Sequence, residues 1–424
     1  MANIKFPFGK EFLEYNFDDN RLLGVLESSI EEYKPLGTAE ELVKSAMENP
    51  IGSPKLSELA KGKKNIVIIA SDHTRPVPSK VIIPPMLREI KEGNPDAEIT
   101  ILIATGCHRG TTRDELVSKF GEDIVNSVNI YVHDCDEREK LVNLGKLPSG
   151  GDCEVNSIAV NADLLVAEGF IEPHFFAGFS GGRKSVLPGV CGRKTVLANH
   201  CGEFIADPHA RTGILEGNPI HNDMLWAAKT AGLCYVVNVV LNAEKEVIYA
   251  VAGDTFEAHK KGVEFLREQC GAKAQPADIV LTTNGGYPLD QNVYQSVKGM
   301  TAGEATVKDG GVIIMIAKCN DGVGGDHFYH QMADEKDLNK IMDEIMSRGR
   351  LETLPDQWMT QILSRILLRA SVIYISEMDD KTVSDMHMIP AHSIDEAMTK
   401  AYEILGRNDC TVTAIPDGVA VMVN

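Results

Sequence analysis

The sequence predicts a two-domain α/β fold in which each domain holds a largely parallel sheet flanked by helices. The chain has 424 residues, which is too many for one ordinary core, and its apolar share of 43% is enough for two. Short apolar runs alternate with amphipathic segments along the chain, which is typical of parallel strands joined by helical crossovers. We expect an active site in the cleft between the two domains.

The first part of the chain carries most of this alternation. We expect strands at residues 65–70, 99–104, 128–132, 163–167, 235–241 and 247–251. We expect helices at residues 38–48, 80–91, 112–120, 222–230 and 256–268. Thr111 or Thr112 is available as the N-cap of the third helix, and acidic residues fill its first turn.

A polar stretch that contains proline, residues 269–277, interrupts the pattern directly before a new strand at residues 278–283. It predicts an N-terminal domain of residues 1–275 and a C-terminal domain of residues 276–424. The second block repeats the alternation, with strands at 312–316, 372–376, 411–415 and 420–423 and helices at 336–346, 357–369 and 394–405.

The charge balance limits the partners of the protein. Asp and Glu number 61 against 42 Lys and Arg, so the net charge is −19. A surface this acidic repels nucleic acid and anionic membranes, and we expect neither as a partner. The sequence shows no signal peptide and no membrane-spanning apolar run, and its nine cysteines are widely spaced, as in reduced proteins. We therefore expect a cytoplasmic globular protein.

Three expected strands of the first domain end in unusual polar loops. The loops are SDHTRPVP (71–78), ATGCHRG (104–110) and the segment from Glu168 to Lys184, which ends in GFSGGRK. Ligands of open α/β sheets bind at the carboxyl ends of the strands, and glycine lets a backbone or ligand approach closely. A single histidine in such a loop is more often structural, but three such loops together indicate one shared cleft.

Common cofactor and metal signatures are missing from the sequence. It contains no Gly-x-Gly-x-x-Gly, and residues 178–185 differ from a phosphate-binding P-loop because Arg183 replaces the required second glycine. That turn fits a phosphate site and a plain tight turn equally well. No His-Glu-x-x-His is present, and the pairs His327/His330 and His133/Cys135 are poor candidates for metal ligands.

One segment of the second domain also suggests a binding site. GGYPLDQ (285–291) follows a strand and opens a helix at residues 292–302. Tyr294 and Lys298 share a face of that helix, Gln295 lies beside them, and a helix N-terminus favours an anion. An ordinary amphipathic helix start explains the same pattern, but opposite the first cleft the segment would form a carboxylate clamp.

Together these motifs resemble the nickel-pincer lactate racemase family. The resemblance covers most of the chain and rests on SDHTRPVP (71–78), ATGCHRG (104–110), EPHFFAGFSGGRKSVLPG (172–189), Asn199-His200 and GGYPLDQNVYQSVKG (285–299), in the order and spacing of the family. It implies an isomerase that racemises D- and L-2-hydroxy acids, with lactate as the first expected substrate.

The resemblance further implies that the N-terminal domain binds a cofactor. Lys184 matches the lysine that covalently carries a nickel-pincer nucleotide, which is a nickel-bound pyridinium-3-thioamide-5-thiocarboxylic acid mononucleotide. His200 matches the nickel ligand, and His108 and His174 match the two acid/base residues. Accessory proteins that build the cofactor are then expected partners, beside the small 2-hydroxy acid itself.

Other residues match positions that line the cofactor or the substrate. In the N-terminal domain these are Asp72 and Arg75. In the C-terminal domain Gln295 and Lys298 match contacts of the substrate carboxylate, and Trp358 matches an aromatic residue near the site. Tyr294, on the same helix start, is a further expected substrate contact.

The chemistry of a 2-hydroxy acid explains such a set of residues. Removing a proton beside a carboxylate builds a second negative charge, whereas moving a hydride leaves the neutral carbonyl carbon of a 2-oxo acid. A hydride needs an acceptor, and a nickel-bound pyridinium would replace the absent dinucleotide site. Two enantiomers need two bases, and imidazole suits both because its ordinary pKa lies near neutral pH.

The sequence leaves alternatives open. The substrate could be a longer 2-hydroxy acid or malate, for which Arg109 or Arg183 would supply an extra cation. A non-catalytic binding protein for a phosphorylated small molecule would keep the 178–184 loop but would not need two convergent histidines. A metal-free proton-transfer racemase would leave Lys184 and His200 without a purpose.

Overall fold

The computed structural model describes residues 2–424 and divides into two compact units. The N-terminal unit holds residues 30–268 and 350–352, and the C-terminal unit holds residues up to 29, 269–349 and 353–424. The break at residue 268 lies near the predicted boundary at residue 275. The placement of residues 2–29 differs from the prediction, because they belong to the C-terminal unit.

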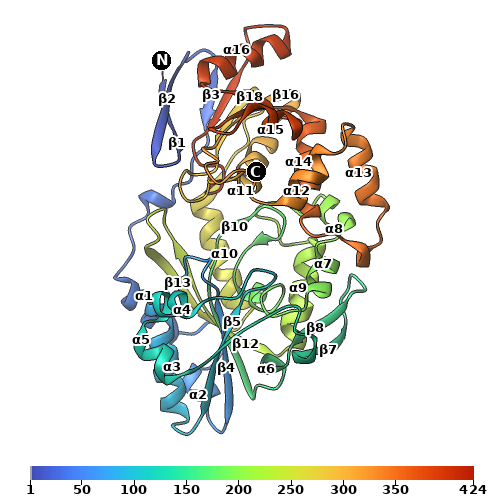
Figure 1. The fold of residues 1–424 in the computed structure, drawn as a ribbon. Coiled ribbons are helices and arrows are strands. Elements are labelled where there is room, and N and C mark those ends of the chain that lie inside the picture. The colour runs from blue at the N-terminus through green and yellow to red at the C-terminus, as the bar shows by residue number, and fades with distance from the viewer. Residues whose placement is uncertain (1) are drawn as a thin grey trace. The chain divides into compact units, whose positions relative to one another are not determined.

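The N-terminal unit is built on a six-stranded sheet of order β13-β12-β9-β4-β5-β6 (Figure 1). Strand β13 (Val247–Gly253) runs antiparallel to its neighbour β12, and the other pairs are parallel. The parallel strands are β4 (Asn65–Ser71), β5 (Glu98–Ala104), β6 (Asn129–Val132), β9 (Leu164–Phe170) and β12 (Leu233–Leu241).

Helices cover this sheet. On one face α1 (Ala39–Glu48), α2 (Leu56–Leu59), α3 (Ser79–Gly93) and α4 (Arg113–Phe120) pack on a core that includes Ile66, Ile68 and Ile101. The elements that follow β9 include the short pair β10 (Pro173–His174) and β11 (Gly178–Phe179), the 3-10 helix η3 (Gly182–Ser185), α7 (Arg193–Asn199), α8 (Gly202–Ala206), α9 (Pro219–Thr230) and α10 (Glu257–Cys270).

The C-terminal unit holds a second six-stranded sheet, of order β18-β17-β16-β15-β19-β3, in which every pair is parallel (Figure 1). Its strands are β3 (Leu22–Val25), β15 (Ala277–Thr283), β16 (Val307–Ile316), β17 (Ser371–Ile375), β18 (Ile389–Ala391) and β19 (Val412–Ile415). Its longer helices are α11 (Val293–Glu304), α12 (Asp326–Ala333), α13 (Leu338–Ser347), α14 (Gln357–Arg369) and α16 (Ile394–Leu405).

An amino-terminal hairpin explains why the first residues join this unit. Strands β1 (Ala2–Phe8) and β2 (Glu11–Phe17) pair antiparallel. Every second side chain of β1 is buried, including Ile4 and Phe6, and these side chains pack on the sheet residues Ile279 and Val312. Burial of this apolar face attaches the hairpin to the C-terminal unit.

Most expected elements are found, with differences at their ends. Thr112, and not Thr111, is the N-cap of α4, and it forms a capping box with Glu115. Strand β9 continues to Phe170, so Glu168, which we expected in a loop, is a buried strand residue. The expected last strand shortens to β20 (Met422–Val423) and pairs with β14 (Gly271–Ala272) outside the main sheet.

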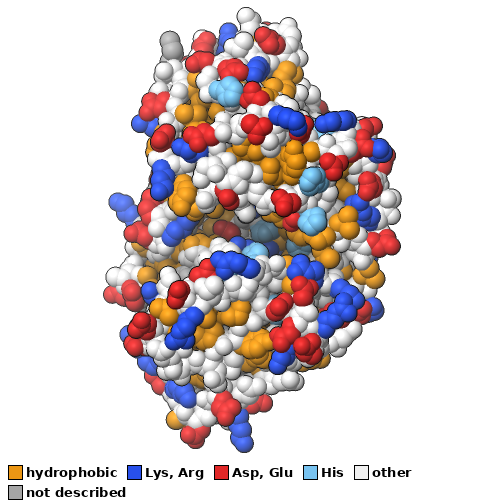
Figure 2. All heavy atoms as spheres, viewed as in Figure 1, with side chains coloured by type: hydrophobic (Ala, Val, Ile, Leu, Met, Phe, Trp, Pro, Cys, Tyr) orange, Lys and Arg blue, Asp and Glu red, His pale blue; other side chains and the backbone are white. Residues whose placement is uncertain are grey.

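Charged side chains of both signs are mixed on the face of the molecule seen in Figure 2. Figure 2 shows acidic and basic side chains interspersed on the visible face, with small hydrophobic areas between them. Within residues 2–424, no helix has the length and apolar character that a membrane crossing requires.

The hairpin assignment predicts the effect of a core substitution. Phe6 is fully buried, so Phe6→Ala should destabilise the C-terminal unit by roughly 3–5 kcal/mol. Phe12 on the partner strand is 61% exposed, and Phe12→Ala should change stability by less than about 0.5 kcal/mol. Hydrogen exchange in urea, analysed for individual peptides, measures the stability of each unit separately. Loss of protection in residues 30–268 alone would contradict the assignment.

Candidate active site

The first predicted loop places a buried carboxylate against a histidine. Asp72 directly follows β4 and is 1% exposed, and its Oδ2 lies 2.8 Å from Nδ1 of His108, which follows β5. Its Oδ1 accepts hydrogen bonds from the backbone N–H and the hydroxyl of Thr74, at 3.2 and 2.7 Å. Because Nδ1 donates to the carboxylate, the neutral ring of His108 carries its lone pair on Nε2.

Asp72 is held in its charged form. Burial alone would raise its pKa, but hydrogen bonds from His108 and Thr74 and the positive charge of Arg75 together lower the pKa below its ordinary value. Arg75 is exposed and donates to the Thr74 hydroxyl at 3.0 Å. The ionised carboxylate of Asp72 fixes the orientation of the His108 ring through the Nδ1 contact.

Glu168 holds both ends of the loop that contains Asp72, through contacts with Ser71 and Ser79. Its Oε1 accepts from the backbone N–H and hydroxyl of Ser71, at 3.3 and 3.4 Å, and from the hydroxyl of Ser79 at 2.8 Å. Burial raises the pKa of Glu168. The residue therefore ties β9 to the end of β4 and to the start of α3.

A second histidine faces the predicted lysine. Nε2 of His174, in β10, lies 3.1 Å from Nζ of Lys184, in η3. Nδ1 of His174 accepts from the backbone N–H of Ala177 at 3.2 Å. The Ala177 contact uses Nδ1 of His174 as an acceptor, and Nε2 is the ring nitrogen that faces Lys184. Gly178 makes the intervening turn with φ +77°, where a Cβ would lie 2.3 Å from the carbonyl oxygen of Ile214.

His200 meets the chemical requirements of a metal ligand. It is buried at the end of α7, and its Nδ1 lies 3.0 Å from the carbonyl oxygen of Val196, so Nδ1 donates and Nε2 carries the lone pair. Burial, and to a smaller extent the positive charge of Lys184, lower the pKa of His200 to about 3, so the ring is neutral. The Phe176 ring lies edge-on to His174 and His200, with centroids 4.6 and 5.1 Å away.

The glycine-rich loop uses much of its own backbone for folding. The N–H groups of Ser180, Gly182 and Lys184 donate to Glu172 O, Asn238 Oδ1 and Gly181 O, at distances of 2.9, 2.9 and 3.2 Å. These three N–H groups are therefore directed into the protein, and they do not form the phosphate cradle that the sequence left open.

Arg183 and Arg109, the two candidates for binding a second substrate carboxylate, form hydrogen bonds within the protein. Arg183 is 1% exposed, and its guanidinium binds backbone carbonyls and imidazoles inside the protein. Arg109 is exposed and binds both oxygens of Glu115, at 3.0 and 2.6 Å. Neither arginine has the position expected of a malate-binding cation.

The predicted substrate residues of the C-terminal unit lie near one end of α11. The side chain of Asn292 caps this helix by accepting from the backbone N–H of Gln295 at 3.0 Å, and Lys298 follows one turn later. The hydroxyl of Tyr294 accepts from Nε1 of Trp358 at 3.1 Å and donates to Asp356 at 3.3 Å. A capped helix start with an amide, an amine and two aromatic side chains suits an anionic organic ligand.

Other candidates have structural roles. His133 is buried, with Nε2 donating to Cys191 O and Nδ1 accepting from the side chain of Asn156, both at 3.0 Å. All nine cysteines are free thiols. Within residues 2–424 one cluster has metal-ligand spacing, at residues 134–136, but Asp136 there forms an ion pair with Arg193.

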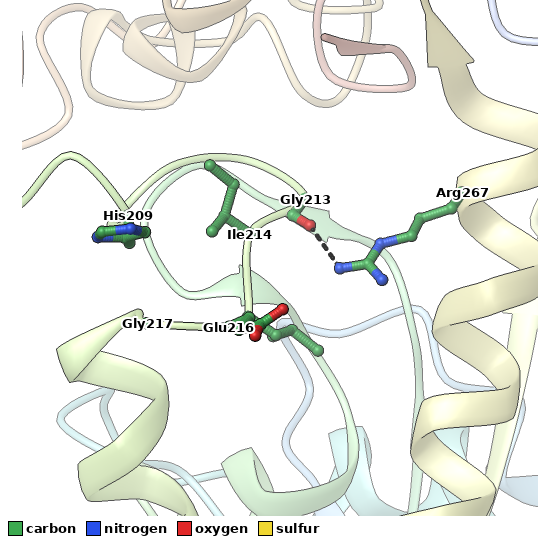
Figure 3. A pocket seen from close by; sticks show the side chains of 7 residues that line it. His209, Gly213, Ile214, Glu216, Gly217 and Arg267 are labelled. Atoms are coloured by element: carbon green, nitrogen blue, oxygen red, sulfur yellow. Dashed lines mark hydrogen bonds between the residues drawn. The ribbon is translucent and has the colours of Figure 1, made fainter.

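A shallow pocket of the N-terminal unit lies apart from the predicted residues. His209, Glu216, Gly217 and Arg267 are among its lining residues, and Arg267 donates to Gly213 O at 3.0 Å (Figure 3). None of the predicted site residues lines it.

Three contributing residues were not singled out by the sequence. Thr74 and Phe176 lie inside the quoted motifs, but no pattern distinguishes the hydroxyl that holds Asp72 or the ring between two histidines. Asn238 lies in β12, far along the chain from the loop that it anchors. Asn238 is a polar residue within an otherwise apolar strand, and this pattern could have indicated a buried hydrogen bond.

The fold and these side chains are those of an α/β enzyme with its polar groups at strand ends. Models of the lactate racemase N-terminal domain and C-terminal domain match residues 8–213 and 272–423. The chain belongs to the lactate racemase family, and it is an isomerase.

Characterised relatives match over their full length. The chain is 55% identical to a lactate racemase of Thermoanaerobacterium thermosaccharolyticum, covering 100% of this chain and 99% of the relative, and 52% identical to one of Lactiplantibacillus plantarum, covering 100% of both. The structure of the lactate racemase apoprotein from the former organism superposes with a TM-score of 0.96 at 54% identity over 100% of both chains. A protein of Thermotoga maritima is similar in fold alone, with a TM-score of 0.64 at 18% identity. The match covers 92% of this chain and 100% of that one.

The state of Asp72 predicts a pH-dependent contribution to stability. Because its pKa is lowered in the folded chain, the carboxylate stabilises the fold above its ordinary pKa of about 4, and this contribution is lost as the pH falls through the folded-state pKa. The urea midpoint of the unmodified chain should exceed that of Asp72→Asn at pH 7, and the difference should shrink below about pH 4.

The matched control for this measurement is Asp207→Asn. Asp207 also pairs with a histidine, His209, at 2.9 Å, but both side chains are more exposed than Asp72. Asp207→Asn should therefore lower the urea midpoint at pH 7 less than Asp72→Asn does. A difference between the chain and Asp72→Asn that is constant from pH 7 to pH 3 would contradict the assignment.

Proposed function

We propose that the chain racemises lactate, with His108 and His174 as the two acid/base residues. The observation that carries this proposal is that the two histidines are held by different and independent partners, Asp72 and the Lys184 segment. The lactate racemases that resemble the chain over its full length support lactate as the substrate.

The cofactor in this proposal is a nickel-pincer nucleotide attached to Lys184. The donor set fits such a group, because Lys184 supplies an amine and His200 supplies a neutral imidazole with its lone pair on Nε2. Imidazole is a suitable nickel ligand, and sulfur atoms of the cofactor would complete the site without a protein cysteine. When bound, the group would supply a hydride acceptor for the C2 carbon of the substrate.

The residues of the chain then move the hydroxyl proton and hold the substrate. One histidine would remove the proton from the substrate hydroxyl as C2 is oxidised to the planar carbonyl carbon of a 2-oxo acid, and the bound cofactor would accept the hydride. When the carbonyl is reduced on its other face, the second histidine would return a proton to the oxygen, so that the opposite enantiomer forms. Asp72 stabilises the imidazolium of His108 during this step, since its carboxylate accepts from Nδ1.

The carboxylate of the substrate needs cations and hydrogen-bond donors. We assign Gln295 and Lys298 to this task, together with Arg75, and we place Tyr294 and Trp358 as aromatic contacts. Arg75 is exposed beside Asp72 and Thr74, so it would also lie next to the cofactor. Accessory proteins that synthesise the cofactor are the implied protein partners.

The structure disfavours a dicarboxylate within this proposal. A second carboxylate such as that of malate would need a further cation, and Arg183 and Arg109 are engaged within the protein. A longer monocarboxylic 2-hydroxy acid stays the alternative substrate, and racemisation assays on a panel of acids would distinguish it from lactate.

The fate of the C2 hydrogen tests the mechanism. The cofactor-loaded chain is incubated in ordinary water with L-lactate that carries deuterium at C2, and the D-lactate formed is analysed by mass spectrometry. Hydride transfer retains the deuterium, because it does not mix with solvent protons. Loss of the deuterium to water would contradict the hydride mechanism and would favour proton abstraction.

His108→Asn is the matched variant for this experiment. The amide keeps a hydrogen-bonding group at this position but cannot serve as a base, so racemisation should fall at least about 100-fold in both directions. A variant that racemises at the rate of the unmodified chain would contradict the two-base scheme.

A further inference from the structure

A fully buried arginine lies directly beside the predicted attachment lysine. Arg183 is 1% exposed, and its guanidinium donates to the carbonyl oxygens of Ala177, Ser180 and Gly181, at 2.8, 3.2 and 3.2 Å. All three carbonyls belong to the short segment between His174 and Lys184. The side chain therefore folds this segment from the inside.

The remaining contacts of Arg183 are imidazoles. Its Nε donates to Nδ1 of His221 at 2.9 Å, and its Nη1 lies 3.3 Å from Nε2 of His259. Nε2 of His259 also lies 2.8 Å from Ser180 O, to which it donates. Burial and the adjacent guanidinium lower the pKa of His221 to about 3 and lower that of His259 as well, so both rings are neutral.

The charge of Arg183 is therefore not balanced by its neighbours. Within residues 2–424, no carboxylate forms an ion pair with it, and its contacts are neutral carbonyls and imidazoles. Burial lowers the pKa of Arg183 to about 9, which leaves the guanidinium charged at neutral pH. Burial of an unpaired charge opposes folding, and proteins usually pair or neutralise such groups. A site that tolerates this penalty commonly has a functional use for the charge.

We propose that Arg183 is a positioning residue that fixes Lys184 opposite His174, and that its unbalanced positive charge draws an anionic cofactor to the Lys184 amine. The first part follows from the three carbonyl contacts, which set the turn that brings Nζ to within 3.1 Å of Nε2. The second follows from the low dielectric of a buried site, where a fixed charge acts strongly on a neighbouring anion. The inference rests on the proposed function in one respect, that Lys184 is the attachment point.

Two aldehydes that differ by one phosphate test this inference on the chain without cofactor. Pyridoxal 5′-phosphate and pyridoxal both condense with a lysine amine, with loss of water, and borohydride reduces the imine to a stable secondary amine. Only the first reagent carries a phosphate charge. Peptide mapping by mass spectrometry then gives the labelling rate at Lys184 and, as an internal reference, at the exposed Lys194.

The unmodified chain should label Lys184 faster with the phosphorylated reagent than with pyridoxal, relative to Lys194. In Arg183→Met this preference should fall about tenfold, as expected for removal of a nearby unit charge. Arg183→Lys should restore part of it, because the charge is kept. A change in the basicity of Lys184 would slow both reagents alike, so the ratio isolates attraction of the anion.

Arg267→Met is the matched control. Arg267 also contacts the loop, since it lies 5.6 Å from the Phe179 ring and donates to Gly213, but it is an exposed residue (Figure 3). Its loss should leave the ratio within about twofold. If Arg183→Met slows labelling by both reagents equally, the charge effect is overturned. The charge effect is also overturned if the unmodified chain shows no preference for the phosphorylated reagent, and this result does not depend on whether the variants fold. Because labelling needs no racemisation, failure of the proposed function would show separately.

Discussion

The arrangement of the site depends on the parallel pairing of β9, β4 and β5. Because neighbouring parallel strands end at the same edge of a sheet, the residues that follow them meet there. Asp72 and His108 come from two such strand ends and form a hydrogen bond of 2.8 Å, and Glu168 in the third strand binds the end of β4. The charged groups are therefore positioned by backbone pairing as well as by their own contacts.

The two histidines are held in different ways, and the difference has chemical consequences. His108 donates from Nδ1 to an ionised carboxylate, which fixes the orientation of its ring. His174 accepts at Nδ1 from a backbone N–H and faces Lys184 through Nε2. A racemase acts on two mirror-image substrates with residues that are not mirror images, so the two histidines of the proposed site need not have equivalent partners.

The sequence predicted the sheets well because buried parallel strands leave an apolar signal, and helices α14 and α16 begin and end where the periodicity placed them. The docking of the β1–β2 hairpin could not be predicted, because alternation shows a buried face but not the sheet that covers it. The motifs located the candidate residues. They did not reveal the burial of Arg183, since its partners His221 and His259 are distant in sequence and an arginine beside two glycines resembles an exposed cation.

The proposed function requires that Lys184 carries a covalently bound cofactor, and the mass of the chain shows whether it does. Intact mass spectrometry compares the chain produced with and without the enzymes that build the cofactor, beside Lys184→Ala and a control, Lys194→Ala, in which an exposed lysine is removed. The account predicts an adduct of several hundred daltons, on the order of a mononucleotide, that needs those enzymes and is absent only from Lys184→Ala. An unmodified chain under conditions that load another lactate racemase, or an adduct retained in Lys184→Ala, would contradict it.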